Sequence, residues 1–403
     1  MKEDVLPEGW VKTTLEYLGK WGSGGTPNRK YKEYYEGNIS WVKTGDLGEK
    51  YLFKSSEYIS KLGLKNSSAK MFPKGAIVLA MYGATIGKVS ILDIEASTNQ
   101  ACAVIIPNEN IDTEFLYYFL LSQKDIFIKK GKGGAQPNIS QAIIKEHDIN
   151  LPPLPEQQYL SKKLTALLDE VAQIKQRLEA IPALLKQFRQ SVLADAVSGR
   201  LINNKFIKNN LLKDSVDILN GARKPISSTE RKKIQGNIPY YGATGIVDYL
   251  NDFTHDGRFL LVGEDGANLL TKAKDLAYVV EGKVWVNNHA HVLKEKPSYC
   301  LNFIKIVINS LDLSAWVTGT AQPKLTKKAL ESLPIPHASL EQQTQIVQKV
   351  ETYFALADEI ETQVKAALEN VNLLTQSILA KAFNGELSAA WRNSKVTETQ
   401  GKV

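Results

Sequence analysis

Apolar residues recur at alternating intervals of four and three between Leu160 and Val192, and this spacing constrains the fold more than any other feature of the chain. It puts the apolar side chains on one seam of an α-helix, in the a/d pattern of a coiled coil. The seam residues are Leu160, Leu164, Leu167, Val171, Ile174, Leu178, Ile181, Leu185, Phe188 and Val192. A helix with such a seam requires a partner that covers it.

The same seam occurs a second time, 186 residues downstream. Its residues are Ile346, Val350, Tyr353, Ala357, Ile360, Val364, Ala367, Val371, Leu374 and Ile378. Because the two seams share one register, we expect them to pair with each other in antiparallel orientation; pairing with another chain is the alternative. Pro182 would cost about 3 kcal/mol inside a helix, so we expect a kink there.

The rest of the chain is also repeated, because short motifs recur in the same order on either side of residue 200. The matched segments are 37–41 with 236–240, 77–80 with 259–262, 99–104 with 288–292, 135–140 with 321–326, 156–158 with 341–343 and 198–199 with 384–385. We therefore predict globular recognition units at 1–150 and 201–336, helical spacers at 151–200 and 337–390, and a tail at 391–403.

The predicted fold class is α+β, with two mixed, strand-rich globules in pseudo-two-fold repeat and two long helices that pair antiparallel. Short buried strands are expected at 77–80 and 101–106, and a helix from 112 to 130. A seam of 33 residues corresponds to a helix of roughly 50 Å, which is one to one and a half turns of B-DNA. Such a molecule would place two reading units on separated DNA sites.

Composition agrees with a polyanionic partner without proving one. The chain has 403 residues, a net charge of +7 and a pI near 9.0. Residues 201–336 carry net +5, whereas residues 337–403 carry net −2. Cys102 and Cys300 form no CxxC motif, the start of the chain has no signal-peptide core, and no apolar run approaches the ~20 residues that span a bilayer. We expect a cytoplasmic protein that does not enter a membrane.

Motifs for phosphate binding or methyl transfer are incomplete. The segment 83–88 resembles a phosphate-binding loop, but it is one residue short between its glycines and has Val89 in place of the Ser or Thr that holds magnesium. We expect a strand followed by a turn. The segment 150–154 contains two prolines but lacks the aromatic residue with which a DNA methyltransferase holds a flipped base. We predict no catalytic centre in this chain.

Candidate metal ligands are weak. A magnesium-dependent nuclease site remains an alternative, built from carboxylates and a lysine that steadies the charge. Its residues would be Asp265, Asp275, Glu281 and Lys283. His289 and His291 would need further ligands to hold a metal, and their counterparts in the first repeat are Gln100 and Cys102. A structural role is therefore favoured for both histidines.

Several turns combine Lys or Arg with Gln, Asn, Thr or Tyr, the residue types that contact phosphates and base edges. Taken singly, each residue is as easily explained as a solvated surface residue; as a repeated set they predict DNA contact. In the first repeat the candidates are Arg29, Lys30, Lys43, Thr44, Tyr82, Lys88, Lys130, Lys132, Gln136 and Asn138. In the second they are Arg223, Lys224, Arg231, Lys232, Tyr240, Tyr241, Lys272, Gln322 and Lys324.

With this order of features, the chain resembles the specificity subunit of a Type I restriction-modification system over essentially its full length. The resemblance rests on two dissimilar globules, each followed by a similar helix, and on several short sequence motifs. These are Leu-Pro-Glu-Gly-Trp at 6–10, Gly-Gly-Thr-Pro at 24–27, Leu-Pro-Glu-Gln-Gln at 154–158, and the matched helix ends at 193–201 and 379–387.

The resemblance implies that each globule reads one half of a split, asymmetric DNA target and that the helices set the gap. It also implies double-stranded DNA, two DNA-adenine methyltransferase subunits and ATP-driven restriction subunits as partners. S-adenosylmethionine, ATP and Mg²⁺ would then belong to those partners, and this chain would bind no cofactor. A non-enzymatic coiled-coil scaffold for proteins is a further alternative.

Overall fold

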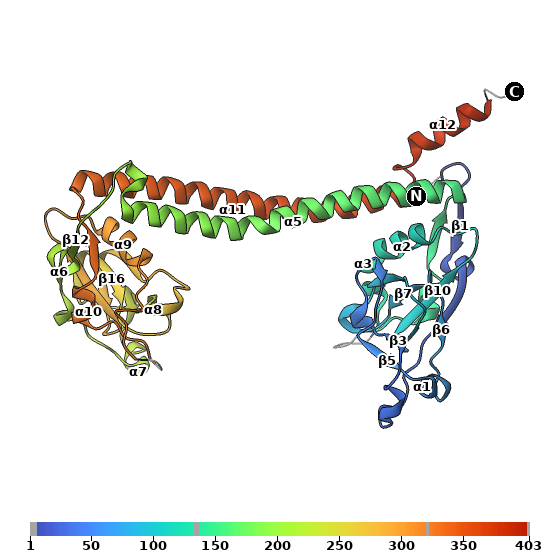
Figure 1. Cartoon of the computed structure of the whole chain (residues 1–403), viewed down its shortest axis with the longest axis horizontal. Coiled ribbons are helices and arrows are strands. Elements are labelled where there is room, and N and C mark those ends of the chain that lie inside the picture. The colour runs from blue at the N-terminus through green and yellow to red at the C-terminus, as the bar shows by residue number, and fades with distance from the viewer. Residues whose placement is uncertain (1–5, 133–136, 320–321, 401–403) are drawn as a thin grey trace. The chain divides into compact units, whose positions relative to one another are not determined.

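The computed structural model describes residues 6–132, 137–319 and 322–400. The chain divides into two compact units, one comprising Met1–Leu178 with Ala367–Val403 and the other Glu179–Ala366. Each unit therefore holds one globule together with a segment of each long helix (Figure 1).

The first unit is built on a sheet of strand order β2-β10-β7-β8-β4. Neighbouring strands are antiparallel except β4 and β8, which are parallel. The strands are β2 (Gly19–Ser23), β4 (Tyr51–Leu52), β7 (Ile77–Ala80), β8 (Val89–Leu92) and β10 (Cys102–Pro107). All residues of β7 are buried, as a continuous apolar run in a central strand requires. The strands predicted at 77–80 and 101–106 are thus confirmed.

Further strands complete the first globule. A sheet of order β5-β3-β9-β6 packs beside the first, and β1 pairs antiparallel with β11 so that the two ends of the globule meet. These strands are β1 (Val11–Thr14), β3 (Ile39–Val42), β5 (Glu57–Ile59), β6 (Met71–Phe72), β9 (Ala96–Thr98) and β11 (Asp148–Leu151).

The helix predicted from 112 to 130 is interrupted at Gln123. The helices of this globule are α1 (Lys61–Lys65), α2 (Thr113–Ser122), α3 (Lys124–Lys130) and α4 (Gln141–Lys145). The Asp112 carboxylate caps α2 by accepting the Phe115 N–H at 2.8 Å. Phe115 and Phe119 of α2 pack edge to face against Phe383, with ring centroids 5.5 and 5.3 Å away. The globule is thereby fixed to the long helix that contains Phe383.

The second unit has a sheet of order β13-β18-β16-β17-β14-β15, in which only the β14–β17 pairing among the described residues is parallel. A separate ribbon pairs β12 with β19. The strands are β12 (Asn209–Leu211), β13 (Val216–Ile218), β14 (Gln235–Gly242), β15 (Gly245–Leu250), β16 (His255–Gly263), β17 (Ala277–Val286), β18 (Ala290–Glu295) and β19 (Pro334–Pro336). The helices are α6 (Leu212–Ser215), α7 (Ser228–Arg231), α8 (Asn268–Thr271), α9 (Leu301–Ser310) and α10 (Lys327–Glu331).

The central strand pairs of the two globules correspond. Ala80 of β7 lies opposite Cys102 of β10, and Val262 of β16 lies opposite His291 of β18. Since β7 and β16 were matched in the sequence, the ladder makes Cys102 and His291 equivalent positions. The matched segments 99–104 and 288–292 therefore occupy the same place in the two sheets.

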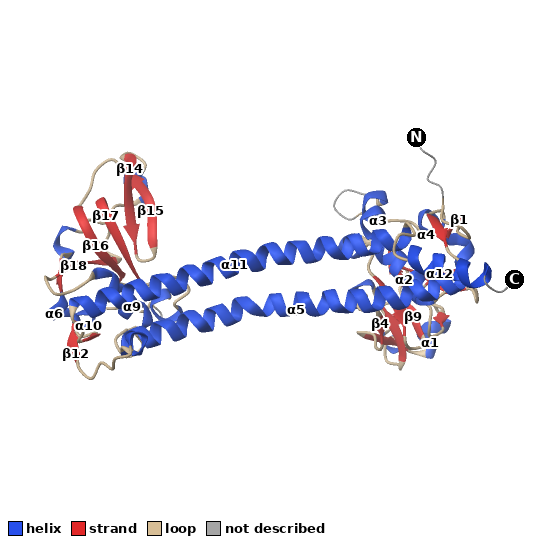
Figure 2. Cartoon of the chain, turned by 90° about the horizontal axis from the view of Figure 1, so that it is seen from above, coloured by secondary structure: helices blue, strands red, loops and turns tan. Residues whose placement is uncertain are grey.

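Two long helices, α5 (Leu154–Ser198) and α11 (Leu340–Phe383), each contribute a segment to each unit (Figure 2). Each helix ends next to a glycine with positive φ. Gly199, directly after α5, has φ 84°, and Gly385, two residues after α11, has φ 87°. The helix α5 continues through Pro182 and is not divided there; the expected kink stays a prediction. Within the described residues, no helix is both long and apolar enough to cross a membrane.

The seam is buried along one of its two heptad positions. Leu164, Val171, Leu185 and Val192 are less than a tenth exposed and Leu178 is half-buried, and all five counterparts of these residues in α11 are less than a tenth exposed. Those counterparts are Val350, Ala357, Val364, Val371 and Ile378.

The other heptad position is less completely covered. Leu160 and Ile346 are buried, but Ile174, Phe188, Tyr353 and Leu374 are more than a third exposed, and Leu167, Ile181, Ile360 and Ala367 are intermediate. Two helices cover each other along only one line, and this position lies at the edge of it where no globule covers it.

Within the second unit, the helix segments run antiparallel. The rings of Phe188 and Tyr353 meet edge to face at 6.0 Å, and Arg189 pairs with Asp358 and Glu361. Just past the end of α5, the Leu201 carbonyl accepts a hydrogen bond of 2.9 Å from the ammonium of Lys349, which lies earlier in α11 than Tyr353. Residue numbers thus rise in one helix as they fall in the other.

A short helix, α12 (Ala389–Gln400), follows α11, although the sequence analysis assigned no structure beyond residue 390. Arg392 pairs with Glu156, which is almost fully buried, and also donates to the Gly385 carbonyl at 2.8 Å. Trp391 stacks on Tyr159 with centroids 5.3 Å apart. These contacts hold α12 against the first turns of α5.

Candidate nucleic-acid interface

A turn in the first globule brings Tyr82 together with Lys132 and Asn138, which the sequence had placed on a separate turn. Lys132 and Asn138 exchange backbone hydrogen bonds of 2.8 and 2.9 Å, and Tyr82 forms an isolated antiparallel β-bridge with Asn138. The Gly83 N–H also donates to the Pro137 carbonyl at 2.8 Å. The predicted contact Gln136 lies outside the described residues.

The second globule repeats this turn bond for bond. Thr318 and Lys324 exchange backbone hydrogen bonds of 2.9 and 2.8 Å, and the backbone of Asp265 forms an isolated antiparallel β-bridge with Lys324. The Gly266 N–H donates to the Pro323 carbonyl at 3.0 Å, and Gln322 is exposed on the loop. Each globule thus presents one hairpin loop beside the turn that follows its central strand.

Two predicted contacts of the first globule converge on a single carboxylate. Arg29 and Lys43 bind Glu57 at 2.7 and 2.6 Å, and the Arg29 guanidinium lies over the Tyr35 ring at 4.3 Å. The hydrogen bond from Lys43, followed by that from Arg29, lowers the pKa of Glu57. Lys130 is also engaged internally, because its ammonium donates to His147 Nδ1 at 3.0 Å. These cations have protein partners with which a phosphate would have to compete.

The second globule has an equivalent cluster around Glu264. Arg223 binds Glu264 at 2.6 Å and donates to the Ala290 carbonyl at 2.9 Å, while Lys324 lies 3.3 Å from the same carboxylate. Burial would raise the pKa of Glu264, but the hydrogen bonds and charges of Arg223 and Lys324 outweigh burial and hold the pKa low.

His291 forms the floor of this cluster and is almost fully buried. Its Nε2–H donates to the Leu325 carbonyl at 2.8 Å, and its Nδ1 accepts from Asn220 at 2.9 Å. Burial lowers the pKa of His291. The network therefore assigns a neutral imidazole with a structural role, as the sequence favoured.

Other predicted contacts of the second globule also have internal functions. Lys272 donates to the carbonyl of Leu311, at the C-terminal end of α9, where a cation is favourable. Tyr240 is 2% exposed, and its hydroxyl accepts the Ile226 N–H at 3.2 Å. Arg231 binds Asp248 at 2.9 Å. Tyr240 and Lys272 thus have internal contacts, and their contact with DNA stays a prediction.

The remaining predicted residues keep free or partly free surfaces. Lys30, Lys132, Lys224 and Lys232 are exposed, Lys88 is half-buried, and none of the five has a carboxylate partner in the described part of the chain. Thr44 and Tyr241 are half-buried. A phosphate contact is therefore best supported at these lysines.

The structure does not assemble the alternative nuclease site. Asp265 follows the end of β16 and binds His289, whereas Glu281 lies opposite Arg258 within that strand. The strand separates these positions by roughly 16 Å or more. Among the described residues, no group of three or more His, Cys, Asp and Glu is placed to hold a metal ion.

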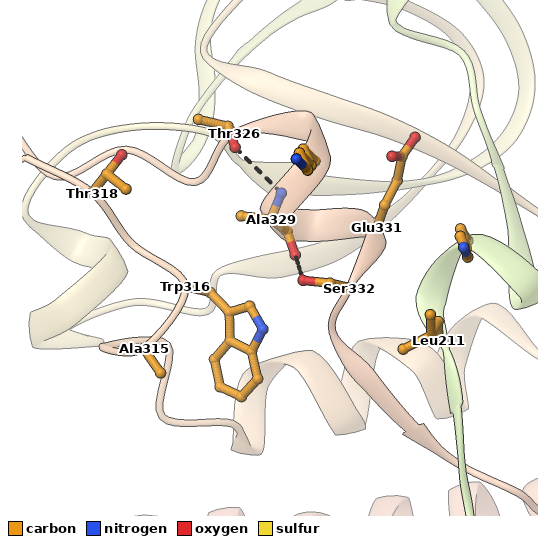
Figure 3. A pocket seen from close by; sticks show the side chains of 10 residues that line it. Leu211, Ala315, Trp316, Thr318, Thr326, Ala329, Glu331 and Ser332 are labelled. Carbon is orange, nitrogen blue, oxygen red and sulfur yellow. Dashed lines mark hydrogen bonds between the residues drawn. The ribbon is translucent and has the colours of Figure 1, made fainter.

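Two concavities in the second globule were not foreseen. One, of about 570 Å³, lies between α10 and the loop that carries Trp316, whose indole extends into it (Figure 3). The other, of about 550 Å³, lies at the end of the sheet near α8 and includes Asn287, Asn288 and His289. The sequence analysis weighed His289 as a metal ligand and favoured a structural role; the paired asparagines before it were the available signal for this concavity.

Known proteins are similar to this chain over most of its length. The Type I restriction enzyme EcoBI specificity subunit of Escherichia coli is 29% identical over 410 residues, which are 91% of this chain and 81% of that protein. The HsdS subunit from Thermoanaerobacter tengcongensis has a TM-score of 0.65 at 18% identity and covers 94% of this chain and 98% of its own. A chain in a structure described as the basis of complex assembly and conformational transition of the type I R-M system has a TM-score of 0.71 at 18% identity, covering 95% and 99%.

The family described as the Type I restriction modification DNA specificity domain matches the chain twice, at residues 7–183 and 208–370. Each match begins with one globule and continues into the long helix that follows it. The two matches correspond to the repeat that the turns and ladders of the two globules display. The chain therefore belongs to the Type I restriction modification DNA specificity domain family.

Proposed function

We propose that this chain is the DNA-recognition subunit of a Type I restriction-modification complex. Each globule reads one half of a split, asymmetric target in double-stranded DNA, and α5 with α11 sets the gap between the halves. The observation that carries the proposal is the double family match on two globules whose turns repeat. The recognition units are 1–150 and 201–336, and the spacers are 151–200 and 337–390.

The exposed lysines support DNA contact, and the hairpin loops offer polar side chains beside them. Two methyltransferase subunits dock along the long helices, where the exposed seam position leaves apolar side chains uncovered. Adenine methylation with S-adenosylmethionine, and ATP- and Mg²⁺-dependent cleavage by restriction subunits, belong to those partner chains. The assembled complex acts on cytoplasmic DNA.

The direct test is a genome-wide map of N6-methyladenine in cells that carry the methyltransferase subunit with and without this chain. A new split motif that depends on this chain is the expected result. No change in methylation, together with no complex between the purified subunits, would refute the proposal.

The division of labour is tested by exchange and insertion. Replacing residues 1–150 by the same unit of another family member should alter one half of the motif and leave the other intact. Insertion of seven residues into both helices keeps the seam in register, so it should lengthen the gap and preserve both halves. A change in both halves after the exchange would contradict the two-reader arrangement.

A further inference from the structure

An open pocket at one end of the second globule's sheet is lined by turns that are far apart in sequence. Its walls come from residues 225–226, from the β14–β15 turn at 242–244, from the segment 265–268 after β16, and from the β17–β18 turn at 287–289. It measures about 550 Å³. The hairpin loop of this globule adjoins it, because the Gly266 N–H donates to the Pro323 carbonyl.

Asn287 offers an unused hydrogen-bond donor at this pocket. The residue is only 6% exposed, and its Oδ1 accepts the His289 N–H at 2.8 Å. Its Nδ2 has no hydrogen-bond partner in the described part of the chain and is not among the fully enclosed unpaired atoms. The fixed Oδ1 orients this amide, and the next residue, Asn288, is exposed with its own amide free.

His289 is held in one orientation by Asp265. Its Nδ1 donates to the two carboxylate oxygens at 2.7 and 3.0 Å. The ring is half exposed, so Nε2 is the nitrogen available to a ligand. A carboxylate that orients one ring nitrogen in this way defines the hydrogen-bonding role of the other.

The charge of the lining side chains indicates whether the pocket suits base edges or phosphates. No lysine lines it in the described residues, and its one arginine, Arg231, is bound by Asp248 at 2.9 Å. Apart from Arg231 and the Asp265 carboxylate, the polar side chains of the lining are amides, hydroxyls and an imidazole, which read donor and acceptor patterns in the major groove. The exposed Lys224 and Lys232 are adjacent in sequence to the lining residues Pro225 and Arg231, where they would meet the backbone.

We propose that this pocket reads base-pair edges of one DNA half-site, with Asn288 and His289 as specificity-determining residues and Asp265 as the positioning residue for His289. This inference rests on the proposed function, because it presumes that the second globule recognises DNA.

The test uses the complex of this chain with its methyltransferase subunits. Methylated sites are selected from a random double-stranded DNA library and sequenced. Asn288→Ala and His289→Ala should each relax one position of a single half-site, with discrimination there falling roughly tenfold or more. The other half-site and the gap should stay unchanged. His289→Gln, which reproduces Gln100 of the first globule, provides a second variant with the volume of the ring partly retained.

Asp265→Ala should relax the same base pair as His289→Ala, and the double variant should show no further change. A role of Asp265 in folding alone would not reproduce that position dependence. Asn237→Ala is the matched control, since Asn237 is an exposed asparagine of the same globule that does not line the pocket; its motif should equal that of the unchanged chain. Lys232→Ala should lower methylation of all sites alike.

Two results would overturn the inference. An unchanged motif for Asn288→Ala, His289→Ala and His289→Gln in folded complexes would remove the pocket from base reading, while the proposed function stands. Uniform loss of methylation without a change of motif would assign these residues a structural role. Absence of any split motif for the unchanged chain would overturn the proposed function and this inference together.

Discussion

Gln157 and Gln343 make the same set of contacts in the two units. The Gln157 Nε2 donates to the Pro152 carbonyl at 2.9 Å and its Oε1 accepts the Asp112 N–H at 2.9 Å. Gln343 repeats this with the Ala338 carbonyl and the Cys300 N–H, both at 2.9 Å.

This correspondence sharpens the repeat. Gln157 and Gln343 are 186 residues apart, which is the shift of the seams, whereas the matched Glu-Gln-Gln triplets at 156–158 and 341–343 are one residue out of structural register. The two long helices therefore start at equivalent positions. No residue is inserted between this buried glutamine and the first residue of the seam.

Replacing either glutamine should destabilise its own unit. Gln157→Ala or Gln343→Ala leaves buried backbone groups unpaired, at about 1–3 kcal/mol. Because the residues lie in different units, the two effects should add. Urea denaturation measures both, and Gln158→Ala, at an exposed position beside Gln157, should stay within about 0.5 kcal/mol of the unchanged chain. Equal effects of Gln157→Ala and Gln158→Ala would contradict the capping role.

The ion pair between Arg392 and Glu156 should be costly to break and cheap to replace. Arg392→Met leaves the buried Glu156 carboxylate without its partner, which should cost about 3–5 kcal/mol. The double change Glu156→Gln with Arg392→Met should recover most of this loss, since no charge then remains buried. Thermal denaturation of the unchanged chain and the two variants checks it. A double variant no more stable than Arg392→Met would show that the pair is not the cause.

Acid should weaken the second unit through His291. Burial lowers the folded-state pKa of His291 below the ordinary histidine value of 6.5, so the unfolded chain binds more protons. The contribution of neutral His291 to the free energy of unfolding is therefore fully present above pH 6.5, and it is lost as the pH falls through the folded-state pKa. Urea midpoints between pH 5 and 8 should show a slope that His291→Ala reduces by at most about 1.4 kcal/mol per pH unit. An unchanged slope would refute this assignment.

The unequal burial of the seam predicts unequal mutational costs. Leu164 is fully buried, whereas Ile174 is 39% exposed on the same helix. Leu164→Ala should destabilise the first unit by about 2–5 kcal/mol, because it removes core contacts and leaves a cavity. Ile174→Ala is the matched control and should cost less than about half as much. Similar losses at both sites by urea denaturation would mean that the seam is covered uniformly.

Surface charge was predicted less well than the repeat. Arg29 and Arg223 were both expected to contact DNA, but Glu57 and Glu264 bind them. Arg223 and Glu264 are 41 residues apart, and their meeting depends on the register of β16 with β18. The pattern of residue types identifies loops that carry candidate contacts. It does not reveal which of their cationic side chains form ion pairs within the protein.

The sequence alone determined the two seams, the repeat and the buried strands, because helical and strand periodicity follow from local backbone geometry. Tertiary structure decided which seam position is covered, which cations remain free, and that Asn287 and His289 share a pocket with Asp265. Each of these depends on contacts between segments distant in the chain, which no local spacing encodes.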